Sequence, residues 1–568
     1  KAVRNIAHGQ VFDENFLMTI ASIAAFAIGQ YPEAVEVILF YQVGELFEKI
    51  AVGRSRQAVS DLLDLCPDEA TVLRDGKPET VLVDEVEVGE HILVRPGEKI
   101  PLDAAVFEGH TTIDTAALTG ESMPVSAAEG DAVCSGCVNL SGAVELVVTK
   151  PASESTASKI MELVEESASS KAKTEQFITK FARYYTPCVV IAALILAVVP
   201  PLIAGQPFSG WIYRALTFLI ISCPCALVIS VPLSFFGGIG CASKNGVLVK
   251  GSNYLEALNK VSVVVFDKTG TLTKGVFEVA NIIPAAGYQK EQVLEYAAQA
   301  ESYSNHPIAK SILATYGKPI DQKQFSGFEE ISGHGISVMV QGKKVLAGNS
   351  KLMESEKIAY AACDAAGTKF YVAADGSYVG CILIADEVKP DSKCAIAELK
   401  KIGVEKTVML TGDDERIGKS VADELGLDAY YAQLLPDQKV EKLEMLDKQK
   451  RQGSKLAFVG DGINDAPVLT RADVGIAMGG LGSDAAIEAA DVVLMDDSPS
   501  KIAKAMRISR RTISIAMQNA VFAIGVKVAI LLLSTIGLAT MSMAVFADVG
   551  VMVLTVFNAM RALKGKAD

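Results

Sequence analysis

The sequence has no surplus of positive charge. Its 53 Lys and Arg residues are outnumbered by 67 Asp and Glu residues, so the formal net charge is −14 at pH 7. Because nucleic-acid-binding proteins usually present a basic surface, this balance argues against a nucleic-acid partner. The chain also lacks internal repeats and low-complexity tracts, which argues against repeat architectures.

Cysteine is scarce for a chain of this size. Ten cysteines scattered over 568 residues do not make a disulfide framework, and they suit a reducing compartment. The first residues, KAVRNIAHGQ, lack the charged start, apolar core and cleavage site of a signal peptide. At roughly 100–200 residues per domain, this length predicts several domains.

Long hydrophobic runs, in contrast, are plentiful, and 50% of all residues are hydrophobic. Several runs approach the roughly 20 residues that a helix needs to cross the hydrocarbon of a bilayer. The short loops GQYPE, AGQPFSG and LATMS would join the runs into three helical hairpins. The six predicted spans lie near residues 16–30, 32–51, 184–204, 212–236, 517–537 and 541–561.

The distribution of Lys and Arg gives these hairpins an orientation. The three short loops contain neither residue, whereas the opposite ends carry KIAVGRSR, KAKTEQFITKFAR, SKNGVLVKG, RISRR and RALKGK. The positive-inside rule therefore places the basic ends, and the long segments between the hairpins, in the cytoplasm. Buried helices of a soluble protein would not sort charge in this way. We expect a monomeric, multi-pass protein in the lipid bilayer of a plasma membrane, the inner membrane of a bacterium.

Two soluble blocks separate the hairpins. Residues 52–165 alternate apolar and polar residues around Gly and Pro, which predicts mostly β-structure. Residues 255–505 contain the short apolar strands VSVVVFD, KTVMLTGD and KLAFVGDG, each running into a Gly- or Asp-rich turn, and they predict an α/β fold. Ligands of such sheets gather at the carboxyl ends of the strands, so the three turns can share one site.

The three turns suit phosphoryl transfer. Asp267 ends the first strand and opens the turn DKTGT, where a carboxylate among backbone donors and hydroxyls can accept a phosphoryl group. Acidic residues in the turns TGD, which ends at Asp413, and GDGIND, residues 460–465, would hold Mg²⁺ together with substrate phosphate. Lys439 would supply a point charge to the transferred group.

The turns also resemble those of a known family. DKTGTLT, TGD and GDGINDAP are similar to the motifs of P-type ATPases, cation pumps that form an aspartyl-phosphate, and LTGES at 118–122 resembles their actuator-domain loop. The resemblance implies a multidomain membrane protein with an α-helical transmembrane bundle. It further implies a β-rich actuator domain at 52–165, an α/β haloacid-dehalogenase-like phosphorylation domain at 255–274 and 381–505, an α+β nucleotide-binding domain at 275–380, and transmembrane hairpins within 1–51, 166–254 and 506–568.

The resemblance implies roles residue by residue. Asp267 is the expected nucleophile, Glu121 directs the water that hydrolyses the phosphoenzyme, and Thr411 and Lys439 contact phosphate. Mg²⁺ would be bound by Asp267, Asp461 and the Thr269 carbonyl group. In the heavy-metal branch of the family a Glu, an HP pair and a GxG motif form the adenine pocket of ATP. The remaining expected catalytic and cofactor-binding residues are Thr119, Gly120, Asp465, Lys268, Gly412, Asp413, Glu301, His306, Gly333 and Gly335.

The fourth span contains the tripeptide Cys223-Pro224-Cys225. A proline inside a span removes a backbone hydrogen bond and kinks the helix, and such breaks are tolerated where they are buried in protein or line a cavity. Two thiolates at the break suit Zn²⁺, Cu⁺ and related ions. CPC resembles the transport site of the heavy-metal P-type pumps, so Cys223 and Cys225 are expected metal ligands.

The last hairpin indicates which ion is carried. Lys527 and Asp548 lie within its two spans, where ionisable groups are costly and mark ion pathways. A carboxylate beside two thiolates favours a divalent ion over Cu⁺, and the pair resembles the zinc, cadmium and lead branch, with Asp548 as ligand and Lys527 as counter-charge. Glu45, at the cytoplasmic end of the second span, is either a solvated helix-end residue or a residue that helps release the metal.

One further cysteine pair has no expected function. Cys134 and Cys137 form the motif CSGC, but a zinc site needs a second pair of ligands, which the sequence does not offer nearby. We therefore expect no metal site there.

The sequence thus predicts an ATP-driven exporter of Zn²⁺, Cd²⁺ and Pb²⁺, with thiol carriers as one route of metal delivery. A copper(I)-exporting pump stays open as an alternative, as do a membrane-anchored phosphatase and a metal sensor that does not pump. Heavy-metal pumps usually carry two further helices, and often a metal-binding domain, before this core, so we expect such segments in a longer protein.

Overall fold

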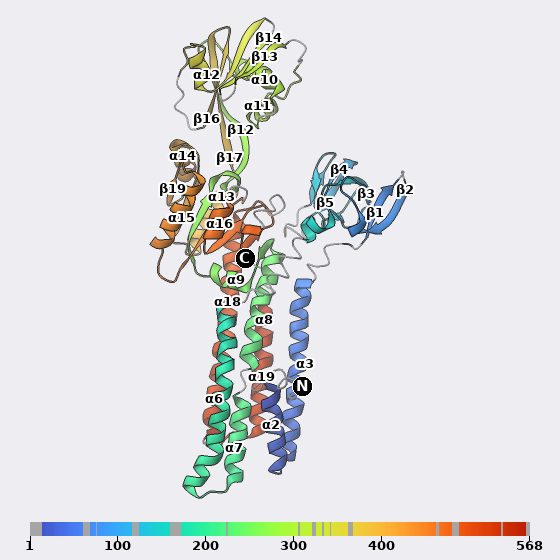
Figure 1. Cartoon of the computed structure of the whole chain (residues 1–568), viewed down its shortest axis with the longest axis vertical. Helices are drawn as coiled ribbons and strands as arrows, with labels where there is room; N and C mark the ends of the chain where they lie inside the picture. The colour runs from blue at the N-terminus through green and yellow to red at the C-terminus, as the bar shows by residue number, and fades with distance from the viewer. Residues whose placement is uncertain are drawn as a thin grey trace.

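A computed structural model gives the fold, in which a bundle of long helices carries two separate groups of strands at one end (Figure 1). It describes residues 14–60, 67, 69–74, 77–115, 124–158, 172–222, 225–304, 307–320, 325–331, 334–340, 342–361, 367–461, 465–479, 488–535 and 538–563.

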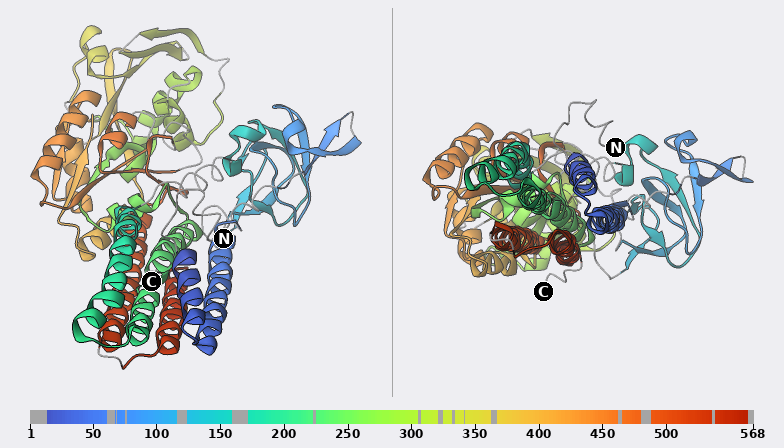
Figure 2. Two further views of the ribbon diagram at one scale, coloured as in Figure 1. Left: turned by 60° about the horizontal axis from the view of Figure 1, so that its bottom comes forward. Right: turned by 90° about the horizontal axis from the view of Figure 1, so that it is seen from below.

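The bundle consists of three helical hairpins, as the hydrophobic runs predicted. Seen end on, the helices lie side by side (Figure 2). Within the described residues, three stretches are long and apolar enough to cross a membrane, and these are Phe208–Lys244, Ser500–Ser534 and Met541–Ala562. The helices of the bundle are α2 (Glu14–Ala27), α3 (Tyr31–Ser60), α6 (Lys173–Ala204), α7 (Phe208–Ile221), α8 (Cys225–Lys244), α18 (Ser500–Thr535) and α19 (Met541–Ala559).

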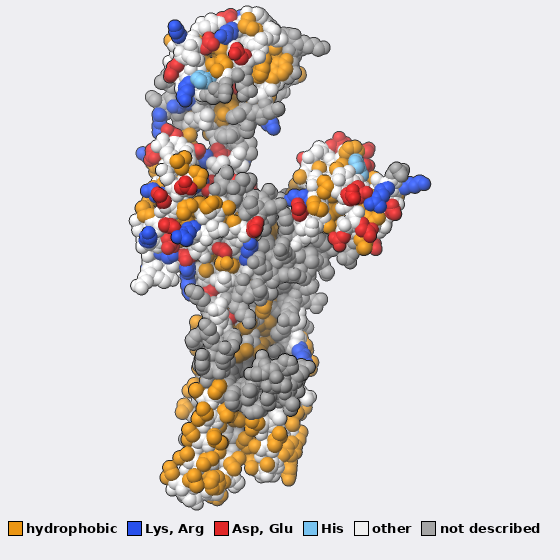
Figure 3. All heavy atoms as spheres, viewed as in Figure 1, with side chains coloured by type: hydrophobic (Ala, Val, Ile, Leu, Met, Phe, Trp, Pro, Cys, Tyr) orange, Lys and Arg blue, Asp and Glu red, His pale blue; other side chains and the backbone are white. Residues whose placement is uncertain are grey.

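The surface of the bundle differs from that of the domains beyond it. Hydrophobic side chains cover its lower part, whereas Lys, Arg, Asp and Glu are spread over the domains (Figure 3). This division is the one expected of helices in lipid that carry domains in water.

A β-rich domain follows the first hairpin. Its main sheet has the strand order β2-β1-β3-β9-β4-β7, and a smaller sheet has the order β6-β5-β8. Alternate residues of strands such as β9 are buried, which is the pattern of a sheet with one face in the core. The strands are β1 (Glu69–Arg74), β2 (Lys77–Leu82), β3 (His91–Val94), β4 (Ala104–Glu108), β5 (Thr111–Asp114), β6 (Val125–Ala127), β7 (Ala132–Val133), β8 (Val138–Asn139) and β9 (Val144–Val148).

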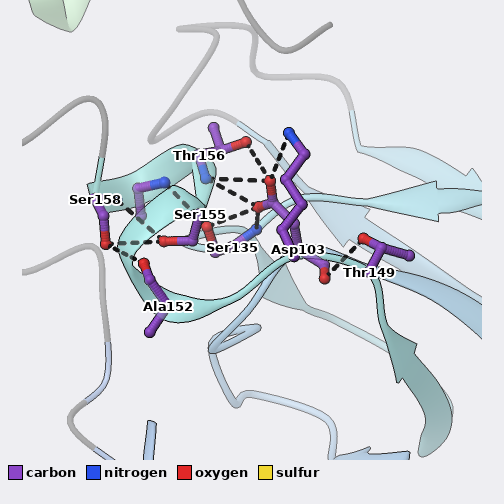
Figure 4. Close-up of polar contacts among 9 residues, drawn as sticks. Asp103, Ser135, Thr149, Ala152, Ser155, Thr156 and Ser158 are labelled. Carbon is purple, nitrogen blue, oxygen red and sulfur yellow. Dashed lines mark hydrogen bonds and ion pairs between the residues drawn. The ribbon is translucent and has the colours of Figure 1, made fainter. Parts of the chain in front are cut away.

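The buried carboxylate of Asp103 connects two loop segments of this β-rich domain. Asp103 accepts hydrogen bonds from the backbone and hydroxyl groups of Ser135 and Thr156, and Lys150 lies 3.5 Å away (Figure 4). The network fastens the segment after β9 to the loop between β7 and β8. In that loop burial is the main reason that the pKa of Cys137 rises to about 12. A thiol that stays protonated is a poor metal ligand.

An α/β domain follows the second hairpin, and its sheet has the strand order β10-β22-β21-β20-β11-β18-β19. The central strand β11 runs parallel to β18 and β20, and all seven of its residues are buried. Helices on both faces explain why its sequence is a continuous apolar run. The strands are β10 (Val247–Val249), β11 (Val261–Asp267), β18 (Lys406–Leu410), β19 (Ala429–Tyr431), β20 (Lys455–Gly460), β21 (Val474–Ala477) and β22 (Val492–Leu494), and the helices are α9 (Ser252–Leu258), α13 (Ser392–Lys401), α14 (Glu415–Leu425), α15 (Pro436–Gln449) and α16 (Ala466–Arg471).

An inserted domain stands on two long strands that rise from the α/β domain (Figure 1). Its six-stranded antiparallel sheet has the order β12-β17-β16-β15-β14-β13. The outgoing and returning strands, β12 and β17, pair with each other over most of their length and so form the hinge between the two domains. Its elements are β12 (Thr273–Pro284), α10 (Lys290–Ala300), α11 (Pro307–Tyr316), β13 (Phe325–Ile331), β14 (Gly335–Val340), β15 (Lys343–Gly348), α12 (Ser350–Ser355), β16 (Thr368–Ala374) and β17 (Ser377–Val388).

Candidate functional site

The carboxyl ends of β11, β18 and β20 meet at one edge of the α/β sheet. In the register of the sheet, Asp267 lies opposite Leu410, and Phe266 lies opposite Val459. The turns that follow these strands therefore begin beside one another, as the sequence predicted. Thr411 directly follows β18 and Asp461 directly follows β20, so both residues belong to this edge.

Lys439 joins two buried carboxylates at this edge. Its Nζ lies 2.6 Å from Asp267 Oδ1 and 2.9 Å from Asp465 Oδ1. Lys439 occupies the first turn of α15, which Pro436 opens at the position where a proline fits a helix start. Asp465 precedes α16. Both helices thus direct one charged side chain toward the end of β11.

These charges set the protonation of Asp267. Burial raises the pKa of Asp267 to about 7, the charge of Asp465 adds to this rise, and Lys439 opposes it. Burial lowers the pKa of Lys439, but the charges of Asp267 and Asp465 outweigh it, so this pKa is raised. Lys439 therefore stays positively charged at neutral pH. The carboxyl group of Asp267 changes between its protonated and its ionised form in the same pH range.

The turn after β11 lies against the carboxylate of Asp461. Gly270 has a φ of +73°, and a Cβ at this position would come 3.0 Å from Asp461 Oδ2. Glycine is therefore required both for the left-handed backbone and for the close approach. Lys389 holds the same turn from the other side, since its Nζ donates to the Gly270 carbonyl group at 2.7 Å.

Two buried polar atoms at this edge lack a partner among the described residues. They are Oδ2 of Asp465 and Oγ1 of Thr271. Buried polar groups are nearly always hydrogen-bonded, so orphaned atoms beside a reactive carboxylate indicate a site that a ligand completes. A cluster of carboxylates with unused oxygen atoms fits Mg²⁺ and a phosphate group, since Mg²⁺ is bound by few carboxylates plus substrate phosphate.

Lys268 connects the phosphorylation turn to the hinge of the inserted domain. Its buried Nζ lies 2.5 Å from Asp413 Oδ2 and 3.3 Å from Asp386 Oδ2. Asp386, on β17, also accepts hydrogen bonds from the Thr273 hydroxyl and, at 2.9 Å, from the Gly275 amide on β12. One carboxylate thus ties both hinge strands to the residue that follows Asp267. Sequence reasoning missed Asp386, because no local pattern announces a contact across 113 residues.

The expected adenine residues are described in part. Glu301 is buried in the turn after α10. Gly335 starts β14 with a φ of +146°, and a Cβ there would come within 2.3 Å of the Ala347 carbonyl oxygen, so the position demands glycine. His306 and Gly333 lie outside the described residues, as do Thr119, Gly120 and Glu121 of the loop LTGES.

A second group of expected residues converges in the bundle. Lys527 Nζ on α18 lies 2.5 Å from Asp548 Oδ1 on α19; Asp548 is buried, and the side chain of Lys527 is 12% exposed. The same Nζ donates to the Ile221 carbonyl group at 3.2 Å. Ile221 is the last residue of α7, and α8 begins at Cys225, so these two helices flank the start of the CPC motif. Cys223 itself and the side chain of Cys225 lie outside the described part of the chain.

Glu45 lies on α3. Its Oε1 is 3.7 Å from Nζ of Lys49, one turn further along the helix. An exposed ion pair of this kind contributes little stability. It neither favours nor opposes a role in metal release.

Comparisons with known proteins agree with this geometry. Residues 64–165 match the P-type ATPase actuator domain, and residues 261–473 match the haloacid dehalogenase-like hydrolases. A cadmium, zinc and cobalt-transporting ATPase of Bacillus subtilis (strain 168) is 57% identical over 567 residues, which cover 100% of this chain and 81% of that relative. A zinc-transporting ATPase of Synechocystis sp. is 54% identical, over 99% of this chain and 78% of the relative.

Solved structures give the same result. The crystal structure of a zinc-transporting PIB-type ATPase in the E2.Pi state superposes with a TM-score of 0.65 and is 36% identical, covering 99% of this chain and 92% of that chain. The fold and the strand-end site define an enzyme that couples ATP hydrolysis to work in a membrane. The chain belongs to the P-type ATPases, in their heavy-metal-transporting PIB branch.

Membership in this family confirms the expected fold class, enzyme class and location. The β-rich domain is an actuator domain, and the α/β domain is of the haloacid-dehalogenase type. The apolar helices cross the membrane several times and the catalytic domains lie in the cytoplasm.

The raised pKa of Asp267 predicts how stability depends on pH. Because the folded-state value of about 7 exceeds the ordinary 3.8, the folded protein holds this proton more tightly than the unfolded chain does. Stability from this group is present below about pH 4 and is lost as pH rises through 7. Asp267→Asn removes the titration, so its melting temperature relative to wild type should increase between pH 5 and 8, measured without Mg²⁺ or nucleotide. Asp437→Asn, an exposed change on α15, is the control, and a difference that does not vary with pH would contradict this electrostatic account.

The hinge contacts of Asp386 predict a selective defect. Asp386→Ala should slow phosphorylation by ATP by roughly tenfold or more, because misplacing the inserted domain separates nucleotide from Asp267. Phosphorylation by inorganic phosphate, which needs no nucleotide, should change much less. Glu387→Gln, which breaks the neighbouring ion pair with Lys274, is the matched control. Equal loss in both phosphorylation assays would reduce Asp386 to a general stabilising residue.

Proposed function

We propose that this ATPase exports Zn²⁺ and Cd²⁺, and also Pb²⁺, from the cytoplasm through an aspartyl-phosphate on Asp267. The observation that carries the proposal is the ion pair of Lys527 and Asp548, in which Lys527 also donates to the carbonyl group of Ile221, just before CPC. The names of the relatives support it, since they transport cadmium, zinc and cobalt or zinc alone.

The choice of ion rests on the chemistry of the ligands. A single charged residue at the centre of a bilayer costs roughly 2.5–3.5 kcal/mol on insertion scales, so two of them are retained for a purpose. A carboxylate is a hard ligand, and together with the thiolates of Cys223 and Cys225 it suits a divalent ion better than Cu⁺. This set makes a copper(I) pump the weaker alternative. A phosphatase or a metal sensor that does not pump has no need of such a site coupled to ATP hydrolysis.

Lys527 has a proposed role once the ion has left. After the ion leaves, the ammonium group would pair with Asp548, from whose Oδ1 its Nζ lies 2.5 Å. Removing one partner of a buried pair leaves an uncompensated charge. Lys527 therefore acts as an internal counter-charge, which competes with the divalent ion for Asp548 and keeps the vacated carboxylate satisfied.

The proposed catalytic step takes place at the end of β11. An ionised Oδ atom of Asp267 attacks the γ-phosphorus of ATP, the bond to the β–γ bridging oxygen breaks, and ADP leaves with that electron pair. Lys439 and Thr411 contact the transferred group, and the charge of Lys439 offsets the negative charge that develops there. Asp465 keeps Lys439 in place through their 2.9 Å contact.

Mg²⁺ would be held by Asp267, Asp461 and the Thr269 carbonyl group, and when bound it neutralises charge on the phosphate oxygens. The orphaned Oδ2 of Asp465 supports a ligand at this place. In the second half of the cycle Glu121, with Thr119 and Gly120, would orient the water that hydrolyses the phosphoenzyme.

The remaining assignments complete the proposal. Adenine would bind between Glu301, His306, Gly333 and Gly335, while Lys268, Gly412 and Asp413 shape the phosphate end of the nucleotide site. Glu45 would help release the metal, thiol carriers would deliver it, and the working unit would be a monomer. The proposed domain limits are those of the sequence prediction, namely actuator 52–165, phosphorylation 255–274 and 381–505, and nucleotide-binding 275–380.

Metal-stimulated ATPase activity of the purified chain in proteoliposomes tests the transport site. Asp548→Ala should lose at least roughly tenfold of the stimulation by Zn²⁺ and Cd²⁺, as should Cys223→Ser and Cys225→Ser. Lys527→Ala should lower stability, because it leaves Asp548 buried without a partner, and combining it with Asp548→Ala should restore stability but not turnover.

The matched control is Phe546→Leu, an exposed change two residues from Asp548 on the same helix. Full Zn²⁺ and Cd²⁺ turnover in Asp548→Ala, with stimulation by Cu⁺, would replace this proposal with the copper pump. ATP hydrolysis that ignores every metal would favour the phosphatase.

A further inference from the structure

Two arginines lie side by side where the third hairpin leaves the membrane on its cytoplasmic side. Nη2 of Arg511, on α18, donates to the main-chain carbonyl group of Arg561 at 3.1 Å, and Nη1 of Arg561 donates to Asn558 Oδ1 at 2.7 Å. Both arginines are exposed. Arg561 lies in the short 3-10 turn Met560–Ala562 that follows α19, so its charge also stands near a helix C-terminus, which favours a cation.

Neighbouring basic residues on α18 have protein partners, whereas this pair has none with negative charge. Arg507 lies 2.6 Å from Glu398, Lys501 lies 2.5 Å from Asp496, and Arg510 donates to the Ile402 carbonyl group. These three face the α/β domain. Across the described residues, neither Arg511 nor Arg561 forms an ion pair with a carboxylate. Two adjacent positive charges repel one another, and a negatively charged partner at this surface would offset that repulsion.

The position of the pair along the helices identifies the kind of partner. One to two turns further into the bundle, on the face of α19 that carries Arg561, lie two large apolar side chains that are strongly exposed, namely Leu554 at 58% and Phe557 at 56%. In a membrane protein such side chains contact acyl chains. Gln518 and Asn558, 3.5 Å apart, occupy the level between them and the arginines. Along these helices the side chains thus change from apolar through polar to cationic. This order matches an anionic phospholipid whose acyl chains lie at the apolar end and whose headgroup lies at the cationic end.

We propose that Arg511 and Arg561 bind the phosphate of an anionic phospholipid headgroup in the cytoplasmic leaflet, with its acyl chains along Leu554 and Phe557. The planar guanidinium group binds phosphate oxygens in bidentate fashion and suits this level of the bilayer. Negatively charged lipids attract basic residues next to a membrane by about 1 kcal/mol each. Continuity with the exposed apolar surface favours a lipid over free inorganic phosphate, which would have no use for that surface.

The proposed lipid lies outside the transport and phosphorylation sites. It contacts both helices of the hairpin that carries Lys527 and Asp548, and it would hold their cytoplasmic ends together. Neither arginine takes part in the proposed reaction.

Native mass spectrometry of the purified full-length chain tests the site, with phosphatidylglycerol titrated against phosphatidylcholine. The double variant Arg511→Gln/Arg561→Gln should bind phosphatidylglycerol about 30-fold more weakly than wild type, which corresponds to about 1 kcal/mol for each arginine. Arg511→Lys/Arg561→Lys, which keeps both charges, should stay within about threefold of wild type. Arg214→Gln, which removes an arginine on α7 that stacks on Trp211, is the control and should change nothing.

The other outcomes would overturn the proposal. Undiminished phosphatidylglycerol binding by the double glutamine variant would exclude these arginines as the site, and equal binding of both lipids would exclude headgroup charge. Full displacement of the lipid by inorganic phosphate would show a phosphate site instead. Should the double variant fail to fold, the single variants Arg511→Gln and Arg561→Gln decide the matter, since each should lose about fivefold.

Discussion

Lys439 lies between two buried carboxylates, and the phosphorylation site depends on the charge that it contributes. Without it, Asp267 and Asp465 would be two buried like charges at one edge of the sheet. Burial and the charge of Asp465 both raise the pKa of Asp267, Lys439 opposes them, and the resulting pKa is about 7. With it, Asp267 can ionise near neutral pH while it remains buried, which is the condition for a carboxylate nucleophile. Lys439 lies in the first turn of α15, and Asp465 directly precedes α16. The starts of these two helices thus place both side chains at the end of β11.

The surroundings of this network link it to the moving parts of an ATPase. Lys268, next to Asp267 in sequence, turns away from Lys439 and pairs with Asp386 and Asp413. Asp386 in turn holds both strands that carry the inserted domain. A change in the orientation of the inserted domain would therefore be transmitted to the turn after Asp267 through Lys268. In the bundle, the pair of Lys527 and Asp548 solves the same physical problem, since each buried charge is tolerated because the other is present.

Much of this architecture could be predicted from the sequence because its signals are local. Apolar runs, short uncharged loops and basic flanks predicted the three hairpins that the structure contains. Parallel strands end at a common edge, so the meeting of the Asp267, Thr411 and Asp461 turns followed from strand order alone. The contacts of Asp386 with Thr273 and of Asp103 with Ser135 and Thr156 could not be predicted, because side chains far apart in sequence leave no periodic trace. The predicted span at 32–51 covers the apolar part of α3, and the helix continues beyond it to Ser60.

The central claim is that Asp267 accepts the phosphoryl group because Lys439 keeps its carboxylate reactive while buried. Incubation of the chain with ATP labelled at the γ-phosphate, in the presence of Zn²⁺ and Mg²⁺, followed by acid quenching and peptide mapping, measures this directly. The account predicts a single acid-stable label on Asp267, which Lys439→Met strongly reduces although that variant keeps the length of the side chain. A label on another residue, or a full label on Asp267 in Lys439→Met, would contradict it.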